Sequence, residues 1–152
     1  MSDSRARKAS QAVLLASADD TEASFYEAMQ RADLDRMMGV WADDDEIACV
    51  HPSGPRVVGP VAVRAGFEAI FVNGPVQVSI HQVRRLESGT AAVHHVIERV
   101  QAESPEGTQT AYILATNVYM RTALGWRMVL HHASPGQPHD MQEVAEPATM
   151  LH

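Results

Sequence analysis

In the first half of the chain, apolar residues recur every three or four positions, the spacing of amphipathic helices. A first helix is predicted after residues that commonly act as N-caps, namely Asp19, Asp20 and Thr21. Its apolar positions are Phe25, Ala28, Met29 and Ala32. Asp33 caps a second predicted helix that reaches Trp41, and Pro60 fits the first position of a third. The pattern therefore predicts three helices before residue 73.

Beyond Pro75 the period of the apolar residues changes to two, as in a strand with one buried face. After an alternating stretch at 76–81, further β-like runs cover 91–100, 110–121 and 126–133, with turn sequences between them. A short strand is also predicted at 47–50, followed by a loop rich in proline and glycine. Helices followed by long antiparallel strands indicate an α+β fold in which a curved sheet wraps around the helices.

The composition limits the domain organisation and the partners. The 152 residues fit one domain, which we place at 19–134, between an N-terminal arm at 1–18 and a C-terminal tail at 135–152. The single cysteine excludes a disulfide framework, and the net charge of −7 argues against nucleic acid as a partner. No apolar run reaches the roughly 20 residues of a membrane span, and no signal-peptide core is visible. We therefore expect a cytoplasmic protein without a membrane partner.

Several short motifs occur in the order of these elements. They are Ala32-Asp33-Leu34-Asp35, Trp41-Ala42-Asp43-Asp44, His51-Pro52, Gly59 leading into Val63-Arg64, the strand 115–119, and the closing run 125–132. With them the stretch from Phe25 to Pro135 resembles the SnoaL-like branch of the nuclear transport factor 2-like superfamily. The resemblance implies a cone-shaped roll with a pocket at its wide end, of the cystatin-like type, and members often pair through the outer sheet face.

The resemblance leaves the function open. Some members are cofactor-independent enzymes similar to ketosteroid isomerase, scytalone dehydratase or limonene epoxide hydrolase, and others are binding or scaffolding domains. The isomerases carry a basic carboxylate before a proline, where this chain has His51. They also carry a helical tyrosine, where this chain has Phe25, with Tyr26 one step away on another helical face. Steroid isomerisation is therefore not predicted, although a histidine at the base position suits proton transfer near neutral pH.

Strand alternation predicts which residues face the pocket. If residues 122–125 form a four-residue hairpin loop, Asn117 lies opposite Leu130 and Ala115 opposite His132. One sheet face then carries Asn117, Tyr119, Met128, Leu130 and His132, and the other carries Thr116, Val118, Arg127, Val129 and His131. The first face suits a small-molecule pocket and the second a dimer surface, and a loop of different length would exchange His131 and His132.

The histidine pairs and Glu98 offer further candidate chemistry. One histidine from each of the pairs His94-His95 and His131-His132, together with His51, could form a three-histidine metal site, but adjacent strand residues point to opposite faces. We predict no metal and no cofactor. Glu98 would act as an acid of raised pKa if it faced the interior, and would otherwise pair with Arg99 or Arg121.

These observations predict an α+β cone that binds a small, largely apolar ligand and forms a homodimer. If the protein is an enzyme, we expect a cofactor-free isomerase, lyase or hydrolase in which His51 moves a proton. The predicted ligand-binding residues are Trp41, Phe67, Asn117, Tyr119 and His132. The alternative is a non-catalytic dimeric interaction module whose cone is filled by its own side chains. A cavity of about 300 Å³ or more would favour the ligand hypothesis.

Overall fold

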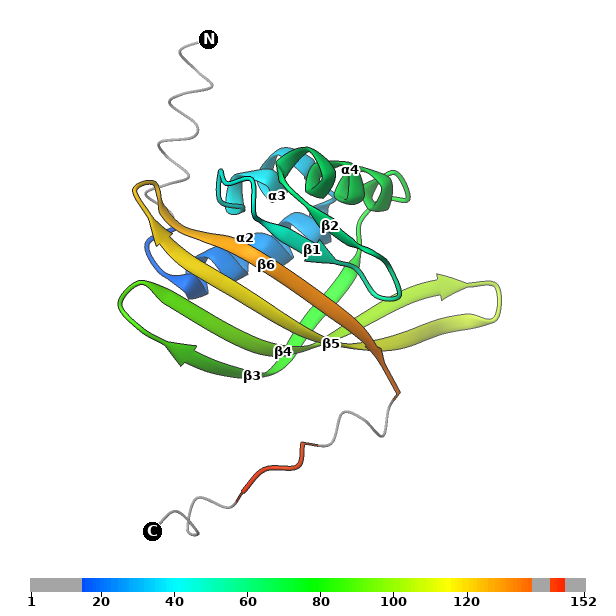
Figure 1. The fold of residues 1–152 in the computed structure, drawn as a ribbon. Helices are drawn as coiled ribbons and strands as arrows, with labels where there is room; N and C mark the ends of the chain where they lie inside the picture. Colours follow the sequence, from blue (N-terminus) through cyan, green and yellow to red (C-terminus); the bar gives the residue numbers. More distant parts are fainter. Residues whose placement is uncertain (1–14, 138–142, 147–152) are drawn as a thin grey trace.

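The computed structural model describes residues 15–137 and 143–146. These residues form three helices and one sheet of six strands (Figure 1). The helices are α2 (Ala18–Arg31), α3 (Leu34–Val40) and α4 (Pro60–Phe71). The strands are β1 (Ala48–Val50), β2 (Arg56–Val58), β3 (Gln77–Glu87), β4 (Ala91–Ser104), β5 (Gly107–Thr122) and β6 (Gly125–Gly136). The predicted α+β class is confirmed.

The sheet has the strand order β2-β1-β6-β5-β4-β3 and is antiparallel except where β1 lies parallel to β6. The three helices cover one of its faces, so that the long curved strands and the helices form a cone (Figure 1). The largest fully buried apolar side chains lie between these layers and include Phe25, Met37, Phe67, Tyr119 and Met128. This arrangement gives the sheet an inner face against the helices and an outer face.

The helix termini follow local capping chemistry. The N-cap of α2 is Ser17, whose hydroxyl accepts a hydrogen bond from the amide of Asp20, so the predicted caps at residues 19–21 were wrong by at least two positions. Asp33 caps α3 as predicted, and Pro60 occupies the start of α4. Asp19 and Asp20 instead lie in the first turn of α2, where the helix dipole favours negative charge.

Two β-bulges shape the long strands. In β3 the register shifts between His81 and Arg84, and between β5 and β6 it shifts between Val118 and Tyr119. In the second bulge Val118 pairs with Leu130 and Tyr119 with Met128, so Val129 is the extra residue. Such insertions bend a strand and exchange the faces of the residues beyond them.

Several features lie outside the predicted boundaries. The predicted loop before α4 contains the short strand β2, which pairs with β1. Leu15 is buried and its carbonyl accepts a hydrogen bond from the amide of Trp126, and β6 extends to Gly136. Most of the predicted arm and tail lies outside the described residues, so the domain limits stay a prediction. Within the described ranges no helix has the length and apolar character needed to cross a membrane.

Candidate functional site

Four polar side chains meet in the interior of the cone, and we call them the interior cluster: Tyr26, Glu98, Asn117 and His131. The Tyr26 hydroxyl donates to Glu98 Oε2 at 2.7 Å, and Asn117 Nδ2 donates to the Tyr26 oxygen at 2.9 Å. His131 Nδ1 lies 2.6 Å from Asn117 Oδ1, and because that oxygen only accepts, Nδ1 carries the proton. His131 Nε2 is 4.0 Å from Glu98 Oε2, so the first and last residues of this series of hydrogen bonds lie close together.

Burial sets the protonation of this cluster. Removal from water raises the pKa of Glu98 to about 7, although the hydrogen bond from Tyr26 partly opposes the rise. Burial also lowers the pKa of His131 to about 3, and the nearby His51 and His132 act in the same direction. At neutral pH the cluster therefore holds a neutral imidazole beside a carboxyl group that exchanges its proton.

His51 lies at the edge of this cluster, directly after β1. Its ring makes an edge-to-face contact with Phe67 at 4.9 Å between centroids and lies 6.3 Å from the His131 ring. Its Nε2 is 3.5 Å from the sulfur of Cys49, a buried thiol whose pKa burial raises to about 12. Partial burial lowers the pKa of His51, so the ring is neutral at pH 7 and able to accept a proton.

Gly66 of α4 makes room for the His51 ring. A Cβ atom at position 66 would lie 3.2 Å from His51 Nε2, which is tighter than ordinary contact. The absence of a side chain at one position of α4 therefore allows the histidine ring to lie against the helix and beside Phe67.

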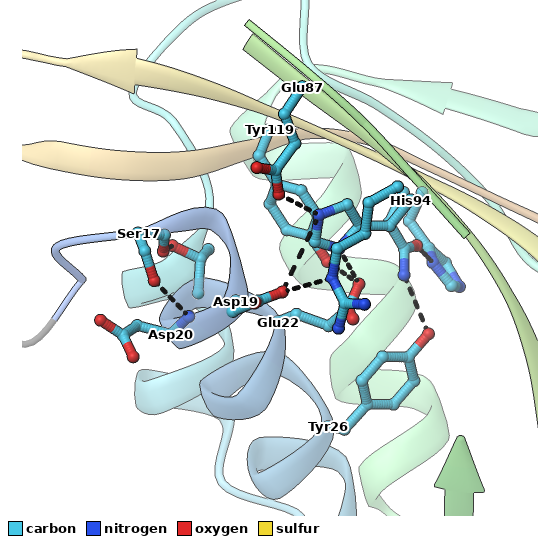
Figure 2. Close-up of polar contacts among 12 residues, drawn as sticks. Ser17, Asp19, Asp20, Glu22, Tyr26, Glu87, His94 and Tyr119 are labelled. Atoms are coloured by element: carbon cyan, nitrogen blue, oxygen red, sulfur yellow. Dashed lines mark hydrogen bonds and ion pairs between the residues drawn. The ribbon is translucent and has the colours of Figure 1, made fainter. Parts of the chain in front are cut away.

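A second polar cluster lies one turn closer to the N-terminus on the same face of α2, and we call it the Glu22 cluster. Glu22 Oε2 accepts a hydrogen bond from the Tyr119 hydroxyl at 2.8 Å and lies 2.8 Å from His94 Nδ1. Figure 2 shows these side chains together with Asp19 and Glu87, which approach the far side of the His94 ring. One turn of α2 separates Glu22 from Tyr26, so this helix contributes to both clusters.

The predicted register placed the wrong histidine inside the cone. The hairpin begins as predicted, with Arg121 opposite Trp126, but the bulge at Val129 brings Asn117 opposite His131 and Thr116 opposite His132. His131 is therefore buried and His132 is exposed on the outer face, whereas the sequence analysis had them reversed. Leu130 likewise lies on the outer face beside His132 and not beside Asn117 and Tyr119.

Among the other candidate residues, Trp41, Phe67, Asn117 and Tyr119 are all buried between helices and sheet. Asn117 belongs to the interior cluster, while the Tyr119 hydroxyl is engaged by Glu22. Trp41 lies 6.2 Å from Phe67 between ring centroids, and its buried indole nitrogen has no hydrogen-bond partner in the described part of the chain. The structure thus brings together His51, Phe67 and Asn117 but places His132 elsewhere.

The interior of the cone is filled by side chains, whereas the predicted pocket would need a cavity there. Phe25, Phe67, Asn117 and Tyr119 have no exposed surface, and the Glu98 and His131 side chains each retain only 3%. A hollow of about 470 Å³ lies instead on the outer face, where Leu114, Leu130 and His132 contribute to its lining. A smaller hollow of about 220 Å³ lies beside Gln30 and the start of β3.

Three residues of the interior cluster are not among the site residues predicted from the sequence, namely Tyr26, Glu98 and His131. Tyr26 was assigned to another helical face than Phe25, yet both are buried because α2 runs inside the cone. Glu98 was weighed both as an interior acid and as the partner of an arginine, and the structure has it in the interior. A signal for Glu98 existed, since Ala92, His94 and Val96 precede it at alternate positions and share its face.

The cluster has the components of acid–base chemistry. A carboxyl group of pKa about 7 can give or take a proton near neutral pH, and a neutral histidine of lowered pKa can accept one. The phenol of Tyr26 and the amide of Asn117 are hydrogen-bond donors of the kind that hold a ligand oxygen. The three helices and the curved sheet of this cone are those of the nuclear transport factor 2-like class.

Comparison with protein families supports this class and identifies the family within it. The model of the SnoaL-like domain matches residues 19–138, and the chain belongs to that family. The comparison with curated proteins returned no match.

Solved structures share the fold. A crystal structure from Thiobacillus denitrificans, provisionally named a calcium/calmodulin-dependent protein kinase type II association domain, is 38% identical, with a TM-score of 0.75 over 82% of this chain and 98% of that one. A provisionally named dehydratase of the NTF2-like family from Streptomyces avermitilis is 28% identical, with a TM-score of 0.70 over 76% of this chain and 91% of that one. The S. rosetta CaMKII hub, at 20% identity, covers 77% of this chain and 92% of its own with a TM-score of 0.62, and shows the fold alone.

Proposed function

We propose that the interior cluster binds a small, uncharged molecule and transfers a proton to or from it without a cofactor, as an isomerase, lyase or hydrolase. The observation that carries the proposal is the convergence of Tyr26, Glu98, Asn117 and His131 in a desolvated interior. Burying four such groups costs free energy that an apolar core of the same size would not lose. Strongly shifted pKa values in one place are typical of functional sites.

The acid and the base in this proposal are Glu98 and His51. Burial raises the pKa of the first and lowers the pKa of the second, and groups whose pKa values are displaced in this way suit opposite proton-transfer roles. The protonated Glu98 gives its proton to the ligand, and the neutral His51 takes one from it. Asn117 and the Tyr26 hydroxyl, once it turns from Glu98, hold the ligand oxygen. The indole N–H of Trp41, which has no partner among the described residues, is a further donor.

The proposal keeps His51, Trp41, Phe67 and Asn117 from the sequence-based hypothesis. It replaces Tyr119 and His132 as ligand-binding residues by Tyr26 and His131, since the Tyr119 hydroxyl belongs to the separate Glu22 cluster and His132 lies outside the cone. Because the ligand-free interior is filled, entry requires displacement of the half-buried His51 ring. That ring contacts Phe67 and lies over Gly66, and His51 belongs to the loop after β1, whereas Asn117 and His131 belong to strands.

The test is a ligand screen by native mass spectrometry with small cyclic ketones, alcohols and phenols as probes. The native protein should retain at least one probe, and the variants Tyr26→Phe and Asn117→Ala should lose it, because each removes a donor from the interior cluster. His51→Ala should retain the probe but lose any proton exchange at its acidic carbon, followed by deuterium incorporation. His132→Ala is the matched control and should behave as the native protein does.

Equal binding by the native protein and both donor variants would exclude the interior cluster as the binding site. Complete lack of binding across the screen would favour the filled cone of an interaction module. Circular dichroism of each variant separates loss of binding from loss of the fold.

A second function, association with further copies of this chain, is supported by the outer face of the sheet. Its hollow of about 470 Å³ includes Ile97, Leu114 and Leu130, and Leu114 is 41% exposed on β5. The Thiobacillus denitrificans structure is named for an association domain and the S. rosetta structure for a hub. We extend that role to this chain and propose a second copy as the occupant of the outer face.

Light scattering coupled to size-exclusion chromatography tests the association. The native protein should have the mass of at least a dimer, and Leu114→Glu should shift it towards the monomer, because a charge on the buried part of an interface is costly. Val61→Glu is the control, since Val61 is 85% exposed on α4, away from the outer face. A monomeric native protein would contradict this second proposal and leave the first unaffected.

A further inference from the structure

The ring of His94 has one satisfied nitrogen and one unsatisfied nitrogen. The side chain is completely buried on β4, and its Nδ1 lies 2.8 Å from Glu22 Oε2. Its Nε2 is buried and has no hydrogen-bond partner among the described residues. A buried polar atom of this kind calls for a physical explanation, because such atoms are almost always paired.

Two carboxylates from separate elements face the unsatisfied nitrogen. Glu87 Oε1, at the end of β3, is 3.5 Å from Nε2, and Asp19 Oδ1, in the first turn of α2, is 4.0 Å from it. The three atoms all lie within 4.8 Å of one another. In Figure 2 dashed lines join both Glu87 and Asp19 to the same nitrogen of the His94 ring.

The hydrogen bond at Nδ1 determines what Nε2 can do. A carboxylate such as Glu22 only accepts, so the proton of the neutral ring lies on Nδ1 and Nε2 presents a lone pair. A lone pair facing two negative oxygens is repulsive unless a cation lies between them. A second proton on the ring or a metal ion removes this repulsion.

The distances around Nε2 distinguish a protonated ring from a metal site. A charged N–H donating to a carboxylate is typically about 2.7–2.9 Å long between heavy atoms, shorter than either separation. Around a tetrahedral zinc ion with bonds of about 2.0–2.1 Å, neighbouring ligand atoms lie about 3.3 Å apart. The separations of 3.5 and 4.0 Å are closer to the spacing of metal ligands.

We propose that Asp19, Glu87 and His94 form a binding site for a divalent transition-metal ion, with Zn²⁺ as the best match. One imidazole nitrogen and two carboxylate oxygens suit Zn²⁺ better than Mg²⁺ or Ca²⁺, which favour oxygen ligands alone. Asp19 and Glu87 are 58% and 52% exposed, so the site opens to solvent and water completes the coordination.

Neighbouring side chains form hydrogen bonds that orient the proposed metal ligands, as is usual around metal sites. Glu22 orients the ligand histidine through Nδ1, and the Tyr119 hydroxyl in turn fixes Glu22. Arg85 Nε donates to Asp19 Oδ1 at 2.8 Å and orients that carboxylate. The three carboxylates and one guanidinium leave two formal negative charges, which a divalent ion neutralises.

The proposal is independent of the interior cluster and is tested with the metal alone. After treatment with a chelator and its removal, the native protein should bind one Zn²⁺ tightly enough to compete with a weak chromophoric chelator. Glu87→Gln and Asp19→Asn should each weaken the affinity about tenfold or more, because each removes a ligand. Both residues are half exposed, so these variants are expected to fold.

Two matched controls address adventitious binding to surface side chains. Asp20→Asn changes the exposed neighbour of Asp19, and His95→Gln changes the exposed neighbour of His94, and neither should alter the affinity. Cobalt(II) in place of zinc should give the intense visible bands of a four-coordinate site in the native protein, and Glu87→Gln should lose them. No Zn²⁺ binding, or equal affinity in the native protein, Glu87→Gln and Asp19→Asn, would overturn the proposal.

Discussion

At the scale of single residues, the hydrogen bonds in the interior of the cone all have the same direction. His131 donates to Asn117, Asn117 to Tyr26, and Tyr26 to Glu98, so every hydrogen bond points towards the carboxyl group. This order favours the ionised carboxylate, whereas burial favours the protonated acid, and burial has the larger effect. The balance leaves Glu98 close to half protonation at neutral pH.

The first prediction concerns the pH dependence of stability. The pKa of Glu98 is raised from 4.5 to about 7 in the folded state, so its contribution to the free energy of unfolding is fully present below pH 4.5 and is lost as the pH rises towards 7. The loss is about 3 kcal/mol at 1.36 kcal/mol per pKa unit. Urea unfolding of Glu98→Gln between pH 4.5 and 7.5 should lack this decline.

His131 acts in the opposite direction, which provides a check on the first prediction. Its pKa is lowered to about 3, so its contribution is present above pH 6.5 and is lost as the pH falls towards 3. Glu98→Gln should therefore become steadily more stable between pH 3 and 6.5. Glu103→Gln, at an exposed position of the same strand, should follow the native protein, and a Glu98→Gln curve identical to the native one would contradict the shifted pKa.

At the scale of elements, one inserted residue decides which histidine is buried. Without the bulge at Val129, alternation along β6 would bring His132 to the inner face, as the sequence pattern indicates. Alternation within β4 and β5 is regular, and the inner positions of Asn117 and Tyr119 were predicted correctly. A bulge depends on how β6 packs against its neighbours, and the local spacing of apolar residues contains no trace of it.

Substitution of the two histidines tests this assignment. His131→Ala should lower the free energy of unfolding by about 2–4 kcal/mol, because it leaves Asn117 Oδ1 unpaired and opens a cavity against Phe25. His132→Ala should change it by less than about 0.5 kcal/mol, as is usual for exposed positions. Denaturant unfolding at pH 7 measures both, and a larger effect at His132 would favour the register expected from the sequence.

The contact between α4 and the loop after β1 gives another prediction. In an open helix position, glycine to alanine stabilises by about 1 kcal/mol, but a Cβ at Gly66 would press on His51 Nε2. Gly66→Ala should therefore gain less than this amount and move the ring outwards, which raises the pKa of His51 towards its ordinary value. Titration of the ring by NMR measures the shift.

The matched control for this variant lies on the same helix. Ala69→Gly, at an exposed position of α4, reports the intrinsic helix preference without a contact to His51 and should cost about 1 kcal/mol. A full gain in Gly66→Ala with an unchanged His51 titration would show that the ring does not lie over the glycine.

At the scale of the whole molecule, α2 is the element on which both polar clusters depend. Tyr26 and Glu22 extend from neighbouring turns of this helix to strands β4 and β5, more than 70 positions away in the sequence. The order of the three helices and the long strands followed from periodicity and turn residues, and the cone was implied by the resemblance to the family. The partners of Glu22, Tyr26 and Glu98 followed from neither, because they are set by how the sheet curves around the helix.

The free thiol of Cys49 makes the opening of this molecule measurable without any added label site. It is the only cysteine of the chain, it lies beneath His51, and burial raises its pKa to about 12, so the closed form hardly reacts with a disulfide reagent. When reclosing is fast, the rate of modification under native conditions is the fraction of molecules that expose Cys49 multiplied by the intrinsic rate of the exposed thiol. A compound lodged among the inner side chains should slow the reaction, and His51→Ala should accelerate it.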